Sequence, residues 1–141
     1  MNQVDESVPL TKENMDKILE YLPYFQNRSN KFYDFIDSDS ESDKLFQFPY
    51  YKYSDKVIEF EKELYNQNFI TTFRWTKGSK KAAEYSVGKQ SLSKAKLEDI
   101  RKLITTIIKQ NGVIEGLLAE VIETGFLCKI LERLKEIKEE L

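Results

Sequence analysis

The spacing of apolar residues is most regular in the C-terminal part of the chain. After Gly125, apolar side chains recur in alternating steps of three and four residues, at Leu127, Ile130, Leu134, Ile137 and Leu141. This spacing predicts a helix with one narrow apolar seam along its length. Two heptads are too short for a stable isolated coiled coil. We therefore expect the fold to cover most of the seam and its end to offer dimer contacts.

Two more helices are predicted directly before this one. Ser93 can cap a long helix that reaches about Gln110 and carries a wide apolar stripe. Asn111–Gly112 interrupts that helix, and Asn111 can cap the next one, which ends at Thr124. Gly125 suits the left-handed conformation that often follows a helix. The chain thus ends in three helices joined by very short turns.

The N-terminal part predicts shorter elements. Residues 1–10 are interpreted as a flexible arm. Thr11 can cap a helix that continues to Leu22, where Pro23 ends or kinks it. The aromatic-rich residues 24–36 are compatible with a short second helix.

A polar run separates these elements from the next helix. Residues 37–43, DSDSESD, contain no apolar side chain and predict an exposed loop. The run lacks the central Gly and the closing Glu of a calcium-binding EF-hand loop. Residues 46–53 are extended or turn-like around Pro49, and Ser54 can cap a helix over residues 55–66.

The middle of the chain is ambiguous. Alternate residues from Phe69 to Trp75 would share one face of a strand, because β-branched and aromatic residues alternate there. The partner strand would be Phe46–Tyr51 or Tyr85–Val87. A helix that starts near Gly78 competes with this hairpin.

Together these elements predict a mainly α protein, a compact bundle of about five or six helices with either one short β-hairpin or a further helix in the middle. A length of 141 residues gives room for one well-filled core. We expect a single helical domain over residues 11–141, preceded by the arm.

The composition excludes several classes of function. The chain has no histidine, which removes histidine-based catalysis and nearly all zinc, copper and non-haem iron sites. The only cysteine, Cys128, cannot form an intrachain disulfide and is expected to pack as a small apolar side chain. No glycine falls in a nucleotide-binding fingerprint. We therefore predict no catalytic residue, no metal and no cofactor, and an enzyme that uses carboxylates is the remaining enzymatic alternative.

The same totals favour a cytoplasmic protein without a membrane segment. The N-terminus lacks the basic start and long apolar run of a signal peptide. No apolar stretch approaches the roughly 20 residues of a membrane span. A lone cysteine suits a reducing compartment.

One segment has the composition of a nucleic-acid-binding site. Phe73 and Trp75 are surrounded by cations in the sequence FRWTKGSKK, at Arg74, Lys77, Lys80 and Lys81. Single-strand binders use aromatic platforms with flanking cations. The net charge of −2 counts against nucleic-acid binding by the chain as a whole. A half-buried Trp75 with solubilising lysines is the structural alternative.

Glu115–Gly116 is the second candidate site. Gly116 falls inside a predicted helix, where glycine costs roughly 1 kcal/mol relative to alanine. Either a neighbouring helix approaches closely there, or the pair lines a groove for a ligand or peptide.

Three segments resemble a family of small bacterial proteins classed as a domain of unknown function. They contain an aromatic–Pro turn before a helix, an aromatic-x-Trp segment, a Glu-Gly-x-x-Ala helix and a closing Ile-Leu-x-Arg-Leu. The matching residues are Pro49, Tyr53, Phe73, Trp75, Glu115, Gly116, Ala119, Glu123, Gly125, Ile130, Leu131, Arg133 and Leu134. The resemblance covers roughly residues 48–135.

The chain departs from that family's pattern in two places. Residues 109–113, KQNGV, stand where the family tends to have charged Arg-x-Glu-Arg-Phe, and Arg74 stands where it tends to have Asp. A polar family site would therefore be altered or lost here. The resemblance implies no activity for this chain, because the family has none assigned.

The leading functional hypothesis is a non-enzymatic protein-interaction module or regulator of bacterial or phage origin. Its partner would be another protein or a second copy bound through the C-terminal helices. Nucleic-acid binding through the Phe73–Lys81 segment is the alternative.

Overall fold

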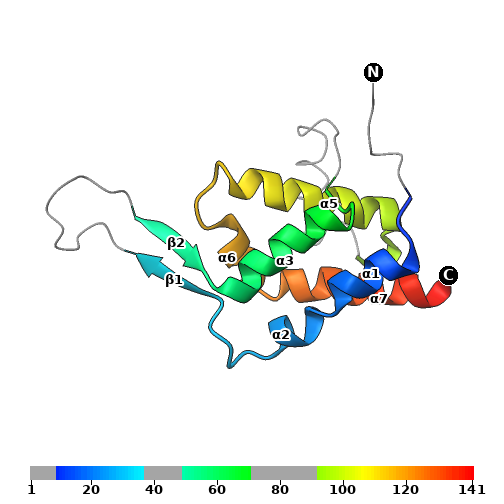
Figure 1. Ribbon diagram of the computed structural model, residues 1–141, viewed down its shortest axis with the longest axis horizontal. Helices are drawn as coiled ribbons and strands as arrows, with labels where there is room; N and C mark the ends of the chain where they lie inside the picture. Colours follow the sequence, from blue (N-terminus) through cyan, green and yellow to red (C-terminus); the bar gives the residue numbers. More distant parts are fainter. Residues whose placement is uncertain (1–8, 37–48, 71–91) are drawn as a thin grey trace, which may run out of the picture.

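The computed structural model describes residues 9–36, 49–70 and 92–141 (Figure 1). Its helices are α1 (Lys12–Leu19), α2 (Leu22–Gln26), α3 (Asp55–Asn66), α5 (Leu97–Asn111), α6 (Leu117–Glu123) and α7 (Phe126–Glu140), with a 3₁₀ turn, η2, at Leu92–Lys94. Two strands, β1 (Tyr33–Ile36) and β2 (Tyr50–Tyr53), form an antiparallel hairpin. The mainly helical class predicted from the sequence is confirmed.

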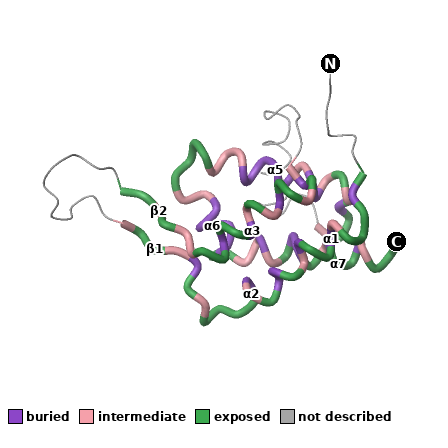
Figure 2. Tube along the Cα trace, viewed as in Figure 1, coloured by how far each residue is buried: buried purple, intermediate pink, exposed green. Residues whose placement is uncertain are grey.

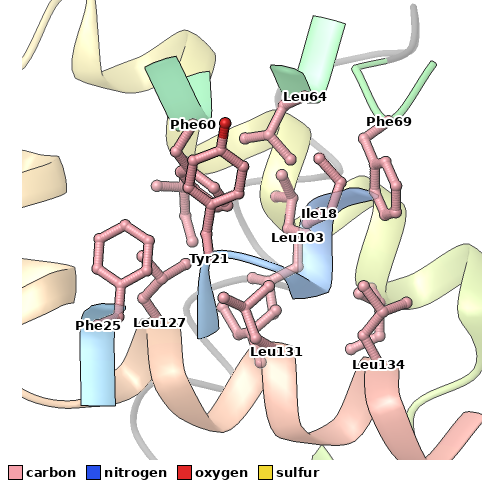
Figure 3. Close-up of a cluster of buried hydrophobic side chains, with 14 of the residues drawn as sticks. Ile18, Tyr21, Phe25, Phe60, Leu64, Phe69, Leu103, Leu127, Leu131 and Leu134 are labelled. Atoms are coloured by element: carbon pink, nitrogen blue, oxygen red, sulfur yellow. The ribbon is translucent and has the colours of Figure 1, made fainter. Parts of the chain in front are cut away.

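The C-terminal helix α7 is the element around which the core forms. It packs against α1, α2, α5 and α6, and its seam residues Leu127, Ile130, Leu134 and Ile137 are buried. Figure 3 shows Leu127, Leu131 and Leu134 facing the apolar side chains of α1, α2, α3 and α5. Leu141, the last position of the seam, is 60% exposed. The fold therefore covers the seam up to its final residue.

The first two helices begin where local chemistry supports them. The Asn14 N–H donates to the Thr11 hydroxyl at 3.1 Å, and the Thr11 N–H donates to the Asn14 side chain at 2.9 Å, so Thr11 caps α1 as predicted. Pro23 does not simply end the helical run. It lies in the first turn of α2, where backbone N–H groups have no partner within the helix, so the N–H that proline lacks is not needed there. Leu10, which the sequence assigned to the arm, is buried against the core.

The hairpin occupies a place that the sequence did not predict. Tyr33 pairs with Tyr53 and Phe35 with Tyr51, so residues 33–36 are a strand and not part of a second helix. The prediction of helix over residues 24–36 was wrong beyond Gln26, because the aromatic face of this segment pairs with residues 50–53. The predicted strand at 69–75 and its alternatives lie mostly outside the described residues; Phe69 itself is buried without being in a strand.

Two C-terminal boundaries also differ from the prediction. Helix α5 begins at Leu97 and not after Ser93, which falls in η2. Helix α6 begins only at Leu117, so Gly116 caps that helix with φ +85° and does not lie inside it. Gly125 has φ +83° between α6 and α7, as the sequence predicted.

The hairpin projects from one end of the molecule, and the C-terminus of α7 lies at the other (Figure 1). The short connection between α5 and α6 is mostly exposed and β1 is part exposed and part intermediate, whereas α5 and α7 carry many buried residues (Figure 2). In the described ranges, no helix is long and apolar enough to span a membrane.

Candidate functional site at the hairpin end

One end of the molecule, which we call the hairpin end, consists of β1, β2 and the α5–α6 connection at residues 112–116. Tyr53 of β2 joins these parts. Its hydroxyl accepts a hydrogen bond from the Ala119 N–H at 3.1 Å and donates to the Asn111 side-chain oxygen at 3.4 Å. The same Asn111 oxygen accepts the Leu118 N–H at 2.9 Å. Asn111 and Tyr53 thus satisfy two backbone donors in the first turn of α6.

The protonation of Tyr53 fits this structural role. Burial raises the pKa of the Tyr53 phenol above its ordinary value, and the carboxylate of Glu115 adds to the rise. The phenol therefore stays protonated at neutral pH and can donate to Asn111. Both its donor and its acceptor capacities are used inside the fold, so Tyr53 is not placed to act as a catalytic acid or base.

The two candidate residues Glu115 and Gly116 contact β2. The Glu115 carboxylate accepts the Tyr51 N–H at 2.6 Å. A Cβ atom at Gly116 would lie 2.5 Å from Cε1 of the Tyr51 ring. The close approach predicted at Gly116 is therefore real, but an aromatic ring makes it and not a neighbouring helix.

Four aromatic side chains form a ladder on one face of the hairpin. In the antiparallel register, Tyr33 and Phe35 of β1 lie opposite Tyr53 and Tyr51 of β2. Ring centroids are 5.0 Å apart for Phe35–Tyr51, 5.3 Å for Tyr33–Tyr51 and 6.3 Å for Tyr33–Tyr53. Such cross-strand pairs stabilise a sheet. The ladder ends at Phe35, which is 53% exposed.

The hairpin end carries several exposed apolar side chains, with Phe35 on the ladder face of the hairpin and Tyr50 on the opposite face. Among the described residues, four of the large apolar side chains classed as exposed belong to the hairpin end: Phe35, Tyr50, Val113 and Ile114. Val113 is the most exposed of them, at 74%. The remaining ones, Ile58, Tyr65 and Leu141, lie in α3 and at the C-terminus.

A second feature is an open hollow of about 420 Å³ between α2, α6 and α7. Arg28 lies on its wall and donates to the carbonyl oxygens of Ile122 and Glu123 at 3.1 and 2.9 Å, which caps the end of α6. Cys128 also lines the hollow. Burial raises the pKa of its thiol, and Glu132 raises it further. The thiol is therefore not activated as a nucleophile.

Metal-binding clusters and the candidate carboxylate Glu115 bear on catalysis within the described residues. Within them, no cluster of three or more Asp, Glu or Cys side chains is placed to bind a metal. Glu115, the carboxylate closest to a possible enzymatic role, is exposed and hydrogen-bonded to backbone. Glu115 is therefore not the sequestered acid that a carboxylate-based enzyme would use; a half-buried carboxyl is that of Glu61 in α3, where burial raises the pKa above its ordinary value.

The structure does not place the other predicted site residues at the hairpin end. Arg74, Trp75, Lys77, Lys80 and Lys81 lie outside the described residues, as does the acidic run at 37–43. Nucleic-acid binding through the basic segment therefore stays a prediction, as does a homodimer through the C-terminal helices.

Sequence reasoning missed Phe35 and Tyr51 as parts of the site. It did assign Asn111 to capping the next helix, and the Asn111 side chain accepts the Leu118 N–H in the first turn of α6. The aromatic alternation in residues 33–36 and 50–53 was the available signal, since two such short runs on either side of a polar stretch can pair as a hairpin. Val113 and Ile114 were assigned to a helix, which concealed their exposure.

The fold is a helical core with an aromatic hairpin docked against α6. The family described as Family of unknown function (DUF6508) matches residues 10–140, and the chain belongs to it. The predicted resemblance to an uncharacterised family is thereby confirmed and extends over nearly the whole chain. Neither a curated protein nor a solved structure showed a significant match.

Proposed function

We propose that this chain is a non-enzymatic protein-interaction module that binds a partner protein through the hairpin end. The observation that carries the proposal is that Phe35, Tyr50, Val113 and Ile114 are all exposed and all belong to the hairpin end. Exposed apolar groups of this kind are frequent in protein–protein contacts when polar residues surround them.

The architecture beneath the surface supports this use. The Tyr53 hydrogen bond attaches the hairpin to α6 and the Glu115 hydrogen bond attaches it to the preceding connection, so the exposed side chains lie on a fixed base. A preformed surface lowers the ordering cost of binding. The lone cysteine and the absence of histidine fit a cytoplasmic binding protein better than an enzyme.

Site-specific photo-cross-linking tests the proposal. The photoreactive residue p-benzoylphenylalanine is introduced at Phe35 or Val113, and the chain is irradiated in the cells that naturally produce it. Matched controls carry the same residue at Ile58 or Tyr65, which are exposed apolar positions of α3.

The proposal predicts that the photoreactive residue at position Phe35 or Val113 forms discrete adducts with one protein. The same residue at position Ile58 or Tyr65 should form no adduct with that protein. Mass spectrometry identifies the captured chain. Adducts to the chain itself would indicate a second copy as the partner. Equal capture from all four positions, or no capture from any, would contradict the proposal.

A further inference from the structure

The hairpin has two edges, and the hydrogen-bond pattern determines which backbone groups face outward. The Ser54 N–H donates to the Phe32 carbonyl oxygen at 2.9 Å, which makes Phe32–Ser54 a hydrogen-bonded pair. Hydrogen-bonded and non-hydrogen-bonded pairs alternate along an antiparallel ladder. Asp34 and Ile36 therefore bond to β2, whereas the N–H and C=O groups of Tyr33 and Phe35 point away from it.

The edge of β2 is already in use. Tyr51 is the β2 residue opposite Phe35, and its outward N–H donates to the Glu115 carboxylate at 2.6 Å. The Tyr53 hydroxyl holds the adjacent turn of α6. A strand approaching from this side would have to displace both contacts.

Among the residues that the structure describes, no such contact covers the edge of β1. In the described part of the chain, the sheet contains only β1 and β2, and no hydrogen bond engages the outward backbone groups of Tyr33 and Phe35. Asp34 and Phe35 are exposed. An open edge of this kind is a template for an added strand.

We propose that the edge of β1 binds an extended segment of the partner protein as an added antiparallel strand. This inference rests on the proposed function and specifies how the hairpin end would bind. The added strand places two residues opposite Tyr33 and Phe35 on the ladder face, where apolar or aromatic side chains pack best. The residue between them lies opposite Asp34 on the other face.

The charge of Asp34 specifies the middle residue of the segment. A Lys or Arg opposite Asp34 gives a favourable cross-strand pair, and an acidic residue gives repulsion. Asp34 already contacts Lys31 and lies opposite Lys52 of β2. The Lys31 and Asp34 side chains are 73% and 52% exposed, so that pair is weak and exchangeable. Lys52 lies one strand further from the added residue than Asp34 does, so Asp34 remains the nearest charge across from it. The chemistry of the occupant is an apolar–basic–apolar extended segment.

A second copy of β1 fits this edge less well. A symmetric pair in which Tyr33 of one copy lies opposite Phe35 of the other would place two Asp34 carboxylates directly across from each other. Like charges in that position are destabilising. The edge therefore favours a segment of a different chain.

Synthetic peptides test the strand addition on the full chain. The probes are acetylated, amidated Thr-X-Lys-X-Thr peptides in which X is Val, Ile, Phe or Tyr. Binding is followed by the amide NMR signals of the ¹⁵N-labelled protein. The proposal predicts binding with a Kd below about 1 mM for at least one probe, slower hydrogen exchange of the Tyr33 and Phe35 amides, and at least fivefold weaker binding when Glu replaces Lys.

N-methylation separates strand addition from simple apolar contact. Methyl groups on both X amides remove the donors that face β1 and are expected to abolish binding. A methyl group on the central Lys amide, which faces away, is the matched control and should leave binding within about twofold. Equal effects of the two modifications would overturn the proposal, as would the absence of binding by every probe.

Protein variants give an independent readout. Phe35→Pro removes an outward donor without removing a β1–β2 hydrogen bond, so the hairpin can still form. It should abolish peptide binding, whereas Phe35→Val should retain it. Asp34→Asn should remove the preference for Lys over Glu. Circular dichroism confirms that each variant keeps its helices, and peptide binding by the Phe35→Pro variant would overturn the proposal.

The outcomes also separate this inference from the proposed function. If photo-cross-links form from Phe35 and Val113 but Phe35→Pro and N-methylation have no effect, the hairpin end binds a partner by another geometry and strand addition is wrong. If the edge amides are protected in the absence of peptide and the mass doubles with concentration, the occupant is a second copy and the proposed segment is wrong.

Discussion

The Tyr53 hydroxyl lies 3.1 Å from the Ala119 backbone nitrogen and accepts its hydrogen bond, which joins the hairpin to the first turn of α6. Helix α6 begins at Leu117 and has no capping side chain of its own at Gly116. Its early N–H groups are instead satisfied by Tyr53 and Asn111. The start of α6 and the position of the hairpin therefore depend on each other.

Removing this hydroxyl tests the dependence. Tyr53→Phe keeps the ring but leaves the buried Ala119 N–H unpaired, and we expect the free energy of unfolding to fall by about 1–2 kcal/mol. Tyr65→Phe removes a hydroxyl from an exposed ring and should change it by less than about 0.5 kcal/mol. Urea denaturation followed by circular dichroism measures both. Equal stability of the two variants would show that the Tyr53 hydrogen bonds do not support the fold.

Gly116 and Gly125 both have a left-handed backbone and form a matched pair. Gly116→Ala adds a methyl group 2.5 Å from the Tyr51 ring at φ +85°. Gly125→Ala adds one at φ +83° with no atom within 4 Å. We expect losses of about 2–4 kcal/mol at Gly116 and about 1–2 kcal/mol at Gly125, because backbone strain is common to both and ring displacement is not.

Thermal unfolding of the two glycine variants gives the comparison. Replacing Tyr51 by Ala in the Gly116→Ala background should recover part of the difference, because the small side chain removes the clash. Similar losses at both glycines would mean that the Tyr51 ring can move away from Gly116 at little cost.

Tyr21 predicts how stability changes at alkaline pH. Burial, and then the hydrogen bond that its hydroxyl donates to Glu59 at 2.7 Å, raise the pKa of Tyr21 above its ordinary value of about 10. As the pH rises past that value, the unfolded chain loses this proton while the folded chain retains it. Stability should therefore fall with rising pH above about 10.

Comparison with Tyr21→Phe isolates this contribution. The variant should lose stability less steeply between about pH 9 and 11, since it has no phenol to titrate at this position. Lysine titration is common to both proteins and cancels in the difference. Parallel pH profiles in urea denaturation would contradict the assignment.

A substitution in the buried part of the α7 seam should lower the stability of the fold without changing the mass of the protein in solution. Leu134 is fully buried, so Leu134→Ala should lower the free energy of unfolding by about 2–5 kcal/mol. Leu141→Ala, at the exposed end of the same seam, should have little effect on stability. Light scattering reports whether Leu141→Ala changes the mass in solution. A change would support dimer contacts at the end of the seam.

Periodicity predicted the helices well because their apolar stripes are long. The seam from Leu127 to Ile137 and the cap at Thr11 were both read from local spacing. The hairpin was misplaced because its strands are four residues each and are separated by the acidic run. Its pairing is a tertiary contact that local spacing does not contain.

The site was predicted only in part, for a similar reason. Glu115 and Gly116 were selected because a glycine inside a helix is costly, yet Gly116 lies before the helix and accommodates Tyr51. The partner ring is distant in sequence, so no local pattern points to it. Val113 is exposed because α5 ends before it, at Asn111. The boundaries of helices and strands are the part of secondary structure that a sequence predicts least well.

The most direct test of the account is the affinity for the protein captured from Val113 by photo-cross-linking. It is compared between the unaltered chain, the double variant Phe35→Ser/Val113→Ser and the control double variant Ile58→Ser/Tyr65→Ser. If the partner binds at the hairpin end, binding should be at least tenfold weaker for the first variant, equivalent to about 1.4 kcal/mol, and should change less than twofold for the control. Equal affinities of the two double variants would show that the hairpin end is not the binding surface.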